Sequence, residues 1–241
     1  MHAHKSFRKY KYNSLSEVVY MSKQSDLSDL RIRLDEAITY GTHREAVKLA
    51  KQGLKEAQEN GLEGEVEYFK GQIELLNKNF TTAIEHFDAA IKHNSNDGAA
   101  YNDRALCMVE LGIIDKAFYY FNKGIEVEPD YATIYHNKGW LLNNIGRHTE
   151  AIECFKKALG LEPNRAVTYD NLADALFNLS DYQGALDAYK KVLRFLKPGC
   201  CRDIKRQVTA RIKSIEIKIS KNKGLIPQIA NPKNTKGTVP K

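Results

Sequence analysis

Residues 132–165 read ATIYHNKGWLLNNIGRHTEAIECFKKALGLEPNR, and this stretch of 34 residues recurs in altered form along the chain. The alanine near its middle has counterparts 34 residues before it, 68 before it and 34 after it. This column consists of Ala83, Ala117, Ala151 and Ala185. A fixed period of this length indicates one structural unit copied several times, and not one globular core.

Two further columns keep the same period. An aromatic residue follows each alanine by four positions, in the order Phe87, Phe121, Phe155 and Tyr189. A small residue precedes each alanine by twelve positions, in the order Gly71, Ala105, Gly139 and Ala173. Small residues let two helices approach to about 8–10 Å, and the aromatic rings can fill the space between successive units. We therefore expect each unit to be a pair of packed helices.

The residues between the expected helices also follow the period. Gly112 and Gly146 suit the left-handed backbone conformation that ends a helix. Asp115 and Thr149 follow these glycines and are expected to cap the free N–H groups of the next helix.

These alanine, aromatic and glycine columns resemble those of the tetratricopeptide repeat family. The stretch from Ala132 to Pro163 is similar to the consensus of that family, and the resemblance covers roughly residues 27–199. It implies an all-α fold, in which helix-turn-helix repeats stack into a right-handed α-solenoid with a concave groove. The family is a binding scaffold used for many tasks, so the resemblance does not imply one particular function.

The period divides the chain into about five repeats. A weaker copy at 27–60 precedes four clear copies, which are expected at 64–97, 98–131, 132–165 and 166–199. Terminal repeats are often atypical, which fits the weaker match of the first copy.

The segments outside the repeats have their own signatures. Residues 1–26 are expected to be a basic, disordered extension, in which Met21 is an alternative start. Residues 200–222 are expected to form a capping helix, because apolar residues recur there at helical spacing. This stripe consists of Ile204, Val208, Ile212, Ile215 and Ile219. Residues 223–241 contain three prolines and are expected to be a disordered basic tail.

The net charge of +7 is unevenly distributed along the chain. Residues 27–196 carry a net charge of −6, whereas residues 1–26 carry +3 and residues 197–241 carry +10. Since the body is acidic, the basic overall composition does not predict nucleic-acid binding by the repeats.

No pattern of catalytic residues or metal ligands stands out in the sequence. The seven histidines and four cysteines match no metal-binding spacing or disulfide framework, although the vicinal pair Cys200 and Cys201 leaves a redox or thiol–metal role open. No phosphate loop or nucleophile motif is present. We therefore expect a protein that is not an enzyme and has no cofactor. Neither a membrane span nor a secretory signal is evident, so a cytoplasmic location is expected.

The family resemblance implies that the first helix of each repeat lines the groove. The residues expected to face a bound peptide are Tyr68, Gln72, Asn102, Asp103, Leu106, His136, Asn137, Trp140, Asn144, Asp170, Asn171 and Asp174. Asparagine amides can pair with the backbone of an extended peptide, and a tryptophan offers an apolar platform. A binding role and a structural role both stay open for these residues, because asparagine and tryptophan at these positions can also serve the packing of one repeat on the next.

Two known modes of groove binding in the family depend on particular residues at these positions. A clamp for the terminal carboxylate of a chaperone is not expected, since the cationic residues that it needs are missing. The corresponding positions hold Asn102, Thr133, His136, Asn137 and Asp170. The asparagine column of the O-GlcNAc transferase superhelix is matched in part, by Asn137 and Asn171 but not by Asp103 and Phe69.

The leading hypothesis is a scaffold that binds a protein or peptide partner in its groove. The first alternative is a structural protein whose repeats bind copies of themselves. The second is an adaptor that binds an anionic partner through its basic ends.

Overall fold

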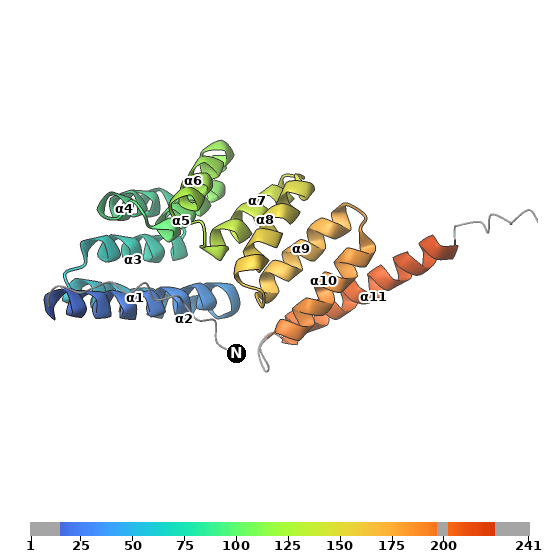
Figure 1. The fold of residues 1–241 in the computed structure, drawn as a ribbon, viewed down its shortest axis with the longest axis horizontal. Helices are drawn as coiled ribbons and strands as arrows, with labels where there is room; N and C mark the ends of the chain where they lie inside the picture. The colour runs from blue at the N-terminus through green and yellow to red at the C-terminus, as the bar shows by residue number, and fades with distance from the viewer. Residues whose placement is uncertain (1–14, 197–201, 225–241) are drawn as a thin grey trace, which may run out of the picture.

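The computed structural model describes residues 15–196 and 202–224, with only the course of the backbone for residues 15–26 and 222–224. This part of the chain is built from helices alone (Figure 1). They are α1 (Leu15–Tyr40), α2 (His43–Glu59), α3 (Glu63–Leu76), α4 (Phe80–His93), α5 (Gly98–Glu110), α6 (Ile114–Val127), α7 (Ala132–Asn144), α8 (His148–Leu161), α9 (Ala166–Asn178), α10 (Tyr182–Phe195) and α11 (Arg202–Gly224). The all-α solenoid implied by the family resemblance is confirmed.

Successive helix pairs stack side by side into an arc (Figure 1). The columns of the sequence lie at the contacts between these helices. The alanines Ala83, Ala117, Ala151 and Ala185 have no exposed surface. Phe87, Phe121 and Phe155 are fully buried, and a Cβ added to Gly139 would lie only 2.8 Å from a ring carbon of Phe155. The small residues are therefore needed for the close approach of the aromatic rings.

The turns inside the repeats share one backbone conformation. Gly112 and Gly146 have φ angles of 74° and 83°, in the left-handed region that the sequence predicts. Lys78 and Ser180 occupy the same position in two other repeats, with φ angles of 64° and 63°. Non-glycine residues rarely adopt this conformation, so the packing of the helices, and not only the residue type, imposes the turn.

The capping role expected for Asp115 and Thr149 is wrong. Helices α6 and α8 begin at Ile114 and His148, so both residues lie inside the first turn of their helices. The glycine turn is so short that the residue directly after the glycine already takes the N-cap position. The corresponding residue in the last repeat, Asp181, is a genuine cap, because its carboxylate accepts a hydrogen bond of 2.9 Å from Gly184 N–H.

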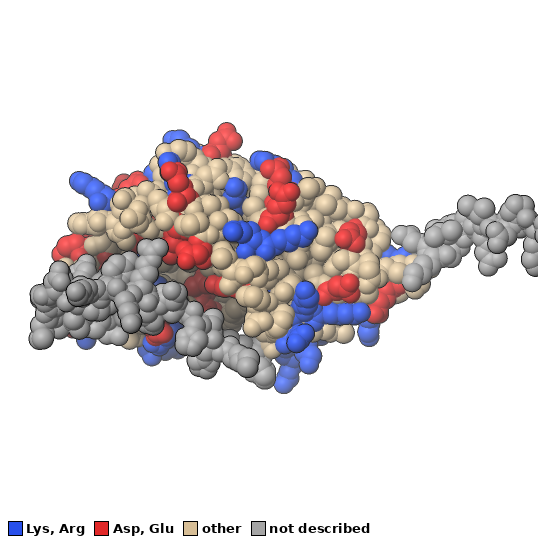
Figure 2. Space-filling model, viewed as in Figure 1, with Lys and Arg blue, Asp and Glu red and all other residues tan. Residues whose placement is uncertain are grey.

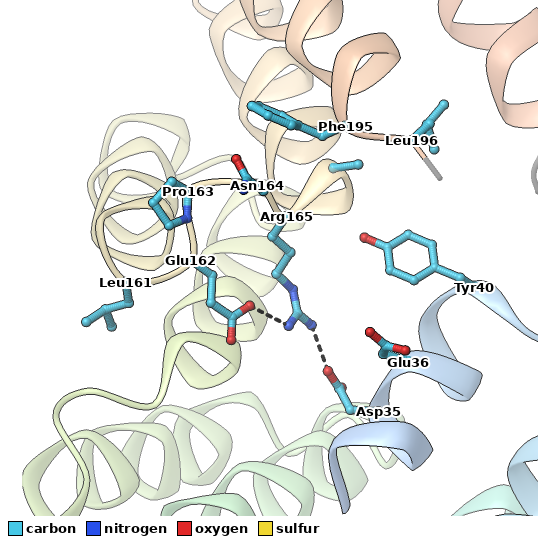
Figure 3. Close-up of a pocket in the computed structure, with 11 residues that line it drawn as sticks. Asp35, Glu36, Tyr40, Leu161, Glu162, Pro163, Asn164, Arg165, Phe195 and Leu196 are labelled. Atoms are coloured by element: carbon cyan, nitrogen blue, oxygen red, sulfur yellow. Dashed lines mark hydrogen bonds and ion pairs between the residues drawn. The ribbon is translucent and has the colours of Figure 1, made fainter. Parts of the chain in front are cut away.

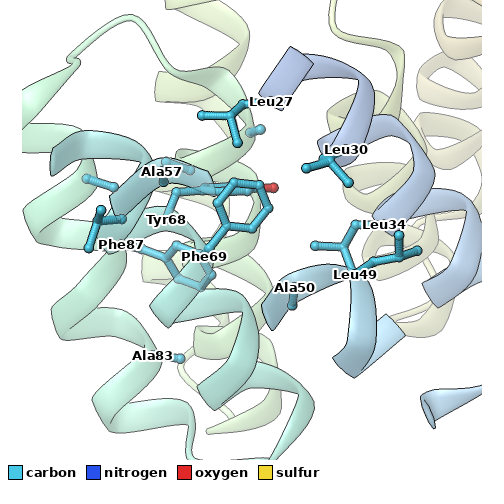
Figure 4. Packing of buried hydrophobic residues seen from close by; sticks show 14 of the residues in the cluster. Leu27, Leu30, Leu34, Leu49, Ala50, Ala57, Tyr68, Phe69, Ala83 and Phe87 are labelled. Atoms are coloured by element: carbon cyan, nitrogen blue, oxygen red, sulfur yellow. The ribbon is translucent and has the colours of Figure 1, made fainter. Parts of the chain in front are cut away.

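The two ends of the array are covered by longer helices. Helix α11 lies against α10 and packs its apolar stripe on the last repeat, where Val208 and Ile215 are buried. At the other end, α1 begins at Leu15, inside the segment that the sequence assigns to an extension. Leu27, Leu30 and Leu34 of α1 pack toward α2 and α3 (Figure 4). The expected tail from residue 225 onward lies outside the described residues.

Candidate functional site

Helix α1 extends across the concave side of the array and contacts the turn between α8 and α9. The Arg165 guanidinium donates hydrogen bonds of 3.2 Å to Asp35 of α1 and of 3.0 Å to Glu162 (Figure 3). The Tyr40 hydroxyl accepts a hydrogen bond of 3.3 Å from Val167 N–H. A cavity of about 400 Å³ lies beside this contact, between α1, the α8–α9 turn and the end of α10. The groove is therefore bounded by α1 and is not an open trough.

A second, larger cavity of about 640 Å³ lies between α1 and the first helices of the later repeats. Among the residues that the structure describes, its lining contains seven carboxylates but only two cationic side chains, Arg31 and Arg165. We call it the acidic hollow; its carboxylates are Asp35, Glu36, Asp97, Asp103, Glu128, Asp130 and Glu162. Acidic side chains are visible at the recess in the middle of the molecule in Figure 2. The potential in the hollow is consequently negative.

The floor of the hollow is a buried network around Asp103. Its carboxylate accepts hydrogen bonds of 3.1 Å from the Tyr68 hydroxyl and of 2.8 Å from the Asn102 amide, and a third from the Gln72 amide. Burial raises the pKa of Asp103 from 3.8 to about 7, and the hydrogen bonds from Asn102 and Tyr68 offset this only in part. The amide oxygen of Gln72 is buried and has no hydrogen-bond partner in the structure.

One wall of the hollow is formed by Arg31 of α1. Its guanidinium donates to both carboxylate oxygens of Asp97, at 3.0 and 2.8 Å, and to Glu65 at 2.9 Å. It also lies over the Tyr68 ring, 3.5 Å from the ring centre. Burial alone would raise the pKa of Asp97, but Arg31 and the N–H groups that Asp97 caps hold it below its ordinary value. Arg31 thereby ties α1 to α3 and α5.

Two asparagines, Asn137 and Asn171, continue the row of predicted groove residues beyond the hollow, and we call this row of residues the polar strip. The Asn137 amide donates to Asn102 at 2.9 Å, and the Asn171 amide lies 3.4 Å from Nε2 of His136. The other ring nitrogen of His136 lies 3.0 Å from the Thr168 hydroxyl. Burial, with a contribution from Arg165, lowers the pKa of His136 to about 3, so the imidazole is neutral. The strip is thus organised by hydrogen bonds that run from one repeat to the next.

The twelve predicted groove residues differ widely in exposure. Five are buried, namely Tyr68, Gln72, Asn102, Asp103 and His136. Six are half-buried, namely Leu106, Asn137, Trp140, Asp170, Asn171 and Asp174. Asn144 is exposed. Trp140 packs against the core between the repeats, and Asp170 and Asp174 lie 3.5 and 3.0 Å from the Arg211 guanidinium of α11. Only part of the strip is therefore accessible, and peptide binding by it stays a prediction.

The sequence pattern missed the contribution of α1 and of the turns between repeats. The last position of successive repeats holds Asp97, Tyr131 and Arg165, and all three line the hollow. This column was visible at the period of 34, but its residue types differ so much that it carries no consensus. The approach of Asp35 to it follows only from the curvature of the whole array.

The buried carboxylate predicts a specific dependence of stability on pH. The pKa of Asp103 rises from 3.8 in the unfolded chain to about 7 in the folded protein. The protonated carboxyl therefore stabilises the fold fully below pH 3.8, and this stabilisation is lost as the pH rises through 7. Relative to the parent chain, Asp103→Asn is expected to gain about 2–3 kcal/mol of unfolding free energy between pH 5 and pH 8. Urea unfolding of both proteins at the two pH values measures this, and the comparison cancels the opposite titration of His136. Parallel pH profiles would refute the assignment.

The described residues contain no group of three or more histidine, cysteine, aspartate or glutamate side chains that could hold a metal ion. Cys107 is buried and Cys154 is half-buried, both as free thiols, whereas the pair Cys200 and Cys201 lies outside the described residues. Within the part of the chain that the structure describes, no helix has both the length and the apolar character needed to cross a membrane.

Comparisons with solved structures support the repeat fold. A thermophilic tetratricopeptide repeat protein of Thermus thermophilus is similar with a TM-score of 0.61 and 18% identity, over 79% of this chain and 99% of that one. The protein MamA is similar with a TM-score of 0.51 and 20% identity, over 67% of this chain and 93% of that one. At these identities the similarity shows the fold alone.

Sequence comparisons show the same repeat. The chain is 36% identical over 52 residues to Hsp70-Hsp90 organizing protein 3 of Arabidopsis thaliana, a match that covers 22% of this chain and 9% of that protein. The matched part is thus a small fraction of that relative. Models of the tetratricopeptide repeat match residues 70–130 and residues 130–197, which together make up more than half of the chain. The chain belongs to the tetratricopeptide repeat family.

Proposed function

We propose that this protein is a non-enzymatic scaffold that binds an extended peptide of a partner protein in its concave groove. Proteins of this family generally mediate protein–protein interactions. The observation that carries the proposal is the hydrogen bonding of the side-chain amides of Asn137 and Asn171. These residues lie one repeat apart on α7 and α9, and both are half-buried. Their amide nitrogens contact neighbouring repeats, but among the described residues neither amide oxygen accepts a hydrogen bond.

This arrangement fits the backbone of a bound peptide. The contacts to Asn102 and His136 hold the two amides in place, so little side-chain freedom is lost when a ligand binds. Each free oxygen can accept one N–H from an extended chain without reading its side chains. The two asparagines therefore recognise the extended backbone of a peptide, and contacts elsewhere on the surface must determine which peptide sequences bind.

Peptide ligands for a test can be selected from a display library of random peptides by their binding to the full chain. We expect micromolar binders, equivalent to roughly −8 kcal/mol. The double variant Asn137→Ala with Asn171→Ala is expected to weaken them about thirtyfold, because two hydrogen bonds of about 1 kcal/mol each are lost. Affinity is measured by fluorescence anisotropy, and circular dichroism checks that the array stays folded.

The matched control is the double variant Asn79→Ala with Asn122→Ala, which removes two amides from outside the groove. It is expected to leave affinity unchanged. If both double variants weakened binding equally, or if selected peptides cross-linked only to the second helices of the repeats, groove binding would be refuted.

The similarity to a chaperone-organising protein does not extend to a carboxylate clamp. The positions that would need cationic side chains for a clamp hold Asn102, Thr133, His136, Asn137 and Asp170, and Thr133 also lines the acidic hollow. A terminal carboxylate would be repelled there. Among the described residues, no specific contact favours self-assembly or binding to an anionic partner. Concentration-dependent light scattering would reveal the first, and salt-sensitive retention on a polyanion would reveal the second.

A further inference from the structure

We propose that the acidic hollow binds a lysine or arginine side chain carried by the extended segment of a partner protein. The inference rests on the proposed groove binding and names the chemistry of the ligand. It is carried by the excess of carboxylates in the cavity, by an unpaired buried acceptor at its floor, and by guanidinium groups already held in its walls.

The carboxylates of the hollow are not balanced by cationic side chains of the described residues. Arg31 and Arg165 are engaged with Asp97 and Asp35. Within the described residues, no lysine or arginine forms an ion pair with Asp103 at the floor or with Asp130 at the exposed rim. A cation placed between floor and rim would therefore meet carboxylates that have no cationic partner.

The second observation is the amide of Gln72. Its side chain is 98% buried, lines the hollow, and donates its N–H groups to the Tyr68 hydroxyl and to Asp103. Its oxygen is left without a hydrogen bond, although a buried acceptor of this kind normally has a partner. An ammonium group has three donors and a guanidinium group has five, so either can bond to this oxygen and to Asp103 together.

Two guanidinium groups of the chain itself are already bound in the walls of the hollow. Arg31 donates to both oxygens of Asp97 and stacks on the Tyr68 ring, and Arg165 donates to Asp35 and Glu162. Planar stacking with paired hydrogen bonds is the usual geometry of a bound guanidinium. The remaining volume of about 640 Å³ is within the range of pockets that bind ligands.

The described cations of α11 do not supply the occupant. Helix α11 packs on the last repeat, and its Arg211 is paired with Asp170 and Asp174. These contacts direct α11 to the last repeat, away from the part of the groove next to α1. A segment of another protein is accordingly the occupant that we propose.

Synthetic peptides with a fluorescent label test the inference on the full chain. The probes are alternating serine–lysine, serine–arginine and serine–glutamate decapeptides, followed by fluorescence anisotropy at fixed ionic strength. We expect the two basic probes to bind and the acidic probe not to bind. The double variant Asp103→Asn with Asp130→Asn is expected to weaken the basic probes at least tenfold.

The control variant removes the same formal charge from outside the hollow. Glu85→Gln with Glu153→Gln changes two carboxylates on α4 and α8 and is expected to alter affinity less than twofold. The single variant Asp130→Asn changes only an exposed rim residue and is expected to weaken the probes at least threefold, which keeps the test valid if Asp103→Asn does not fold. Equal losses in the two double variants would overturn the inference, because the attraction would then be nonspecific.

Two further outcomes would also overturn it. The first is tighter probe binding by the full-length variant Lys9→Gln with Lys11→Gln, since the chain's own lysines would then be the occupant. The second is that neither basic probe binds while peptides from the random library still depend on Asn137 and Asn171. That second result would leave the proposed groove function intact, whereas a failure of the library peptides would refute the function itself.

Discussion

A chain truncated after Lys197 is expected to unfold at least 10 °C below the full chain and to aggregate. The truncation removes α11, whose Val208 and Ile215 are buried on the last repeat and whose three other stripe residues are partly buried there. Burial of a large aliphatic side chain stabilises by about 1.5–3 kcal/mol, so the helix contributes roughly 5 kcal/mol. For a protein of this size each kcal/mol shifts the melting temperature by about 2–4 °C.

Scanning calorimetry with light scattering measures both effects. The control is truncation after Gly224, which keeps all of α11 and is expected to melt like the full chain. A chain ending at Lys197 that melted like the full chain and stayed monomeric would show that α11 is dispensable for stability. Its basic surface would then need a different explanation, such as partner binding.

The variant Arg31→Met is expected to lose about 3–5 kcal/mol of unfolding free energy. It leaves Asp97 and Glu65 without the guanidinium that pairs with both, and an uncompensated buried charge is strongly destabilising. The loss is expected to appear first in α1, because Arg31 links this helix to α3 and α5. Urea unfolding gives the free energy, and hydrogen exchange of the α1 amides locates the change.

Arg33→Met is the matched control from the same helix. Its guanidinium is half exposed and lies 3.8 Å from the exposed carboxylate of Asp29, a pair that contributes little. We expect a change below about 0.5 kcal/mol for this variant. Similar losses in both variants would mean that Arg31 acts through the helical propensity of α1 and not through its buried ion pairs.

The sequence alone predicts the repeat because each column is enforced by a contact inside one unit or between neighbours. Ala151 and Gly139 must be small where a phenylalanine ring packs, and this need repeats every 34 residues. The capping residues were misassigned for the same local reason. A turn that begins with Gly112 or Gly146 leaves no room for a cap three positions further on.

The acidic hollow could not be predicted from the period. Asp35 and Arg165 are 130 residues apart, and the distance between them depends on the accumulated curvature of several repeats. Small rotations at each repeat decide whether α1 meets the α8–α9 turn, and no single residue encodes them. For the same reason the burial of Tyr68 and Asp103 was not foreseen, since α1 covers positions that would face an open groove in a straighter array.

The contact between α1 and the α8–α9 turn also bears on how the chain folds. In a linear array each repeat senses only its neighbours, so the ends can fray independently. The bonds of Asp35 and Tyr40 to Arg165 and Val167 join the first repeat directly to the boundary between the last two clear copies. The array thereby becomes a loop in which distant repeats gain stability together, and this loop can close only after the intervening repeats have stacked. Cooperativity of unfolding is then a property of the closed arc as a whole.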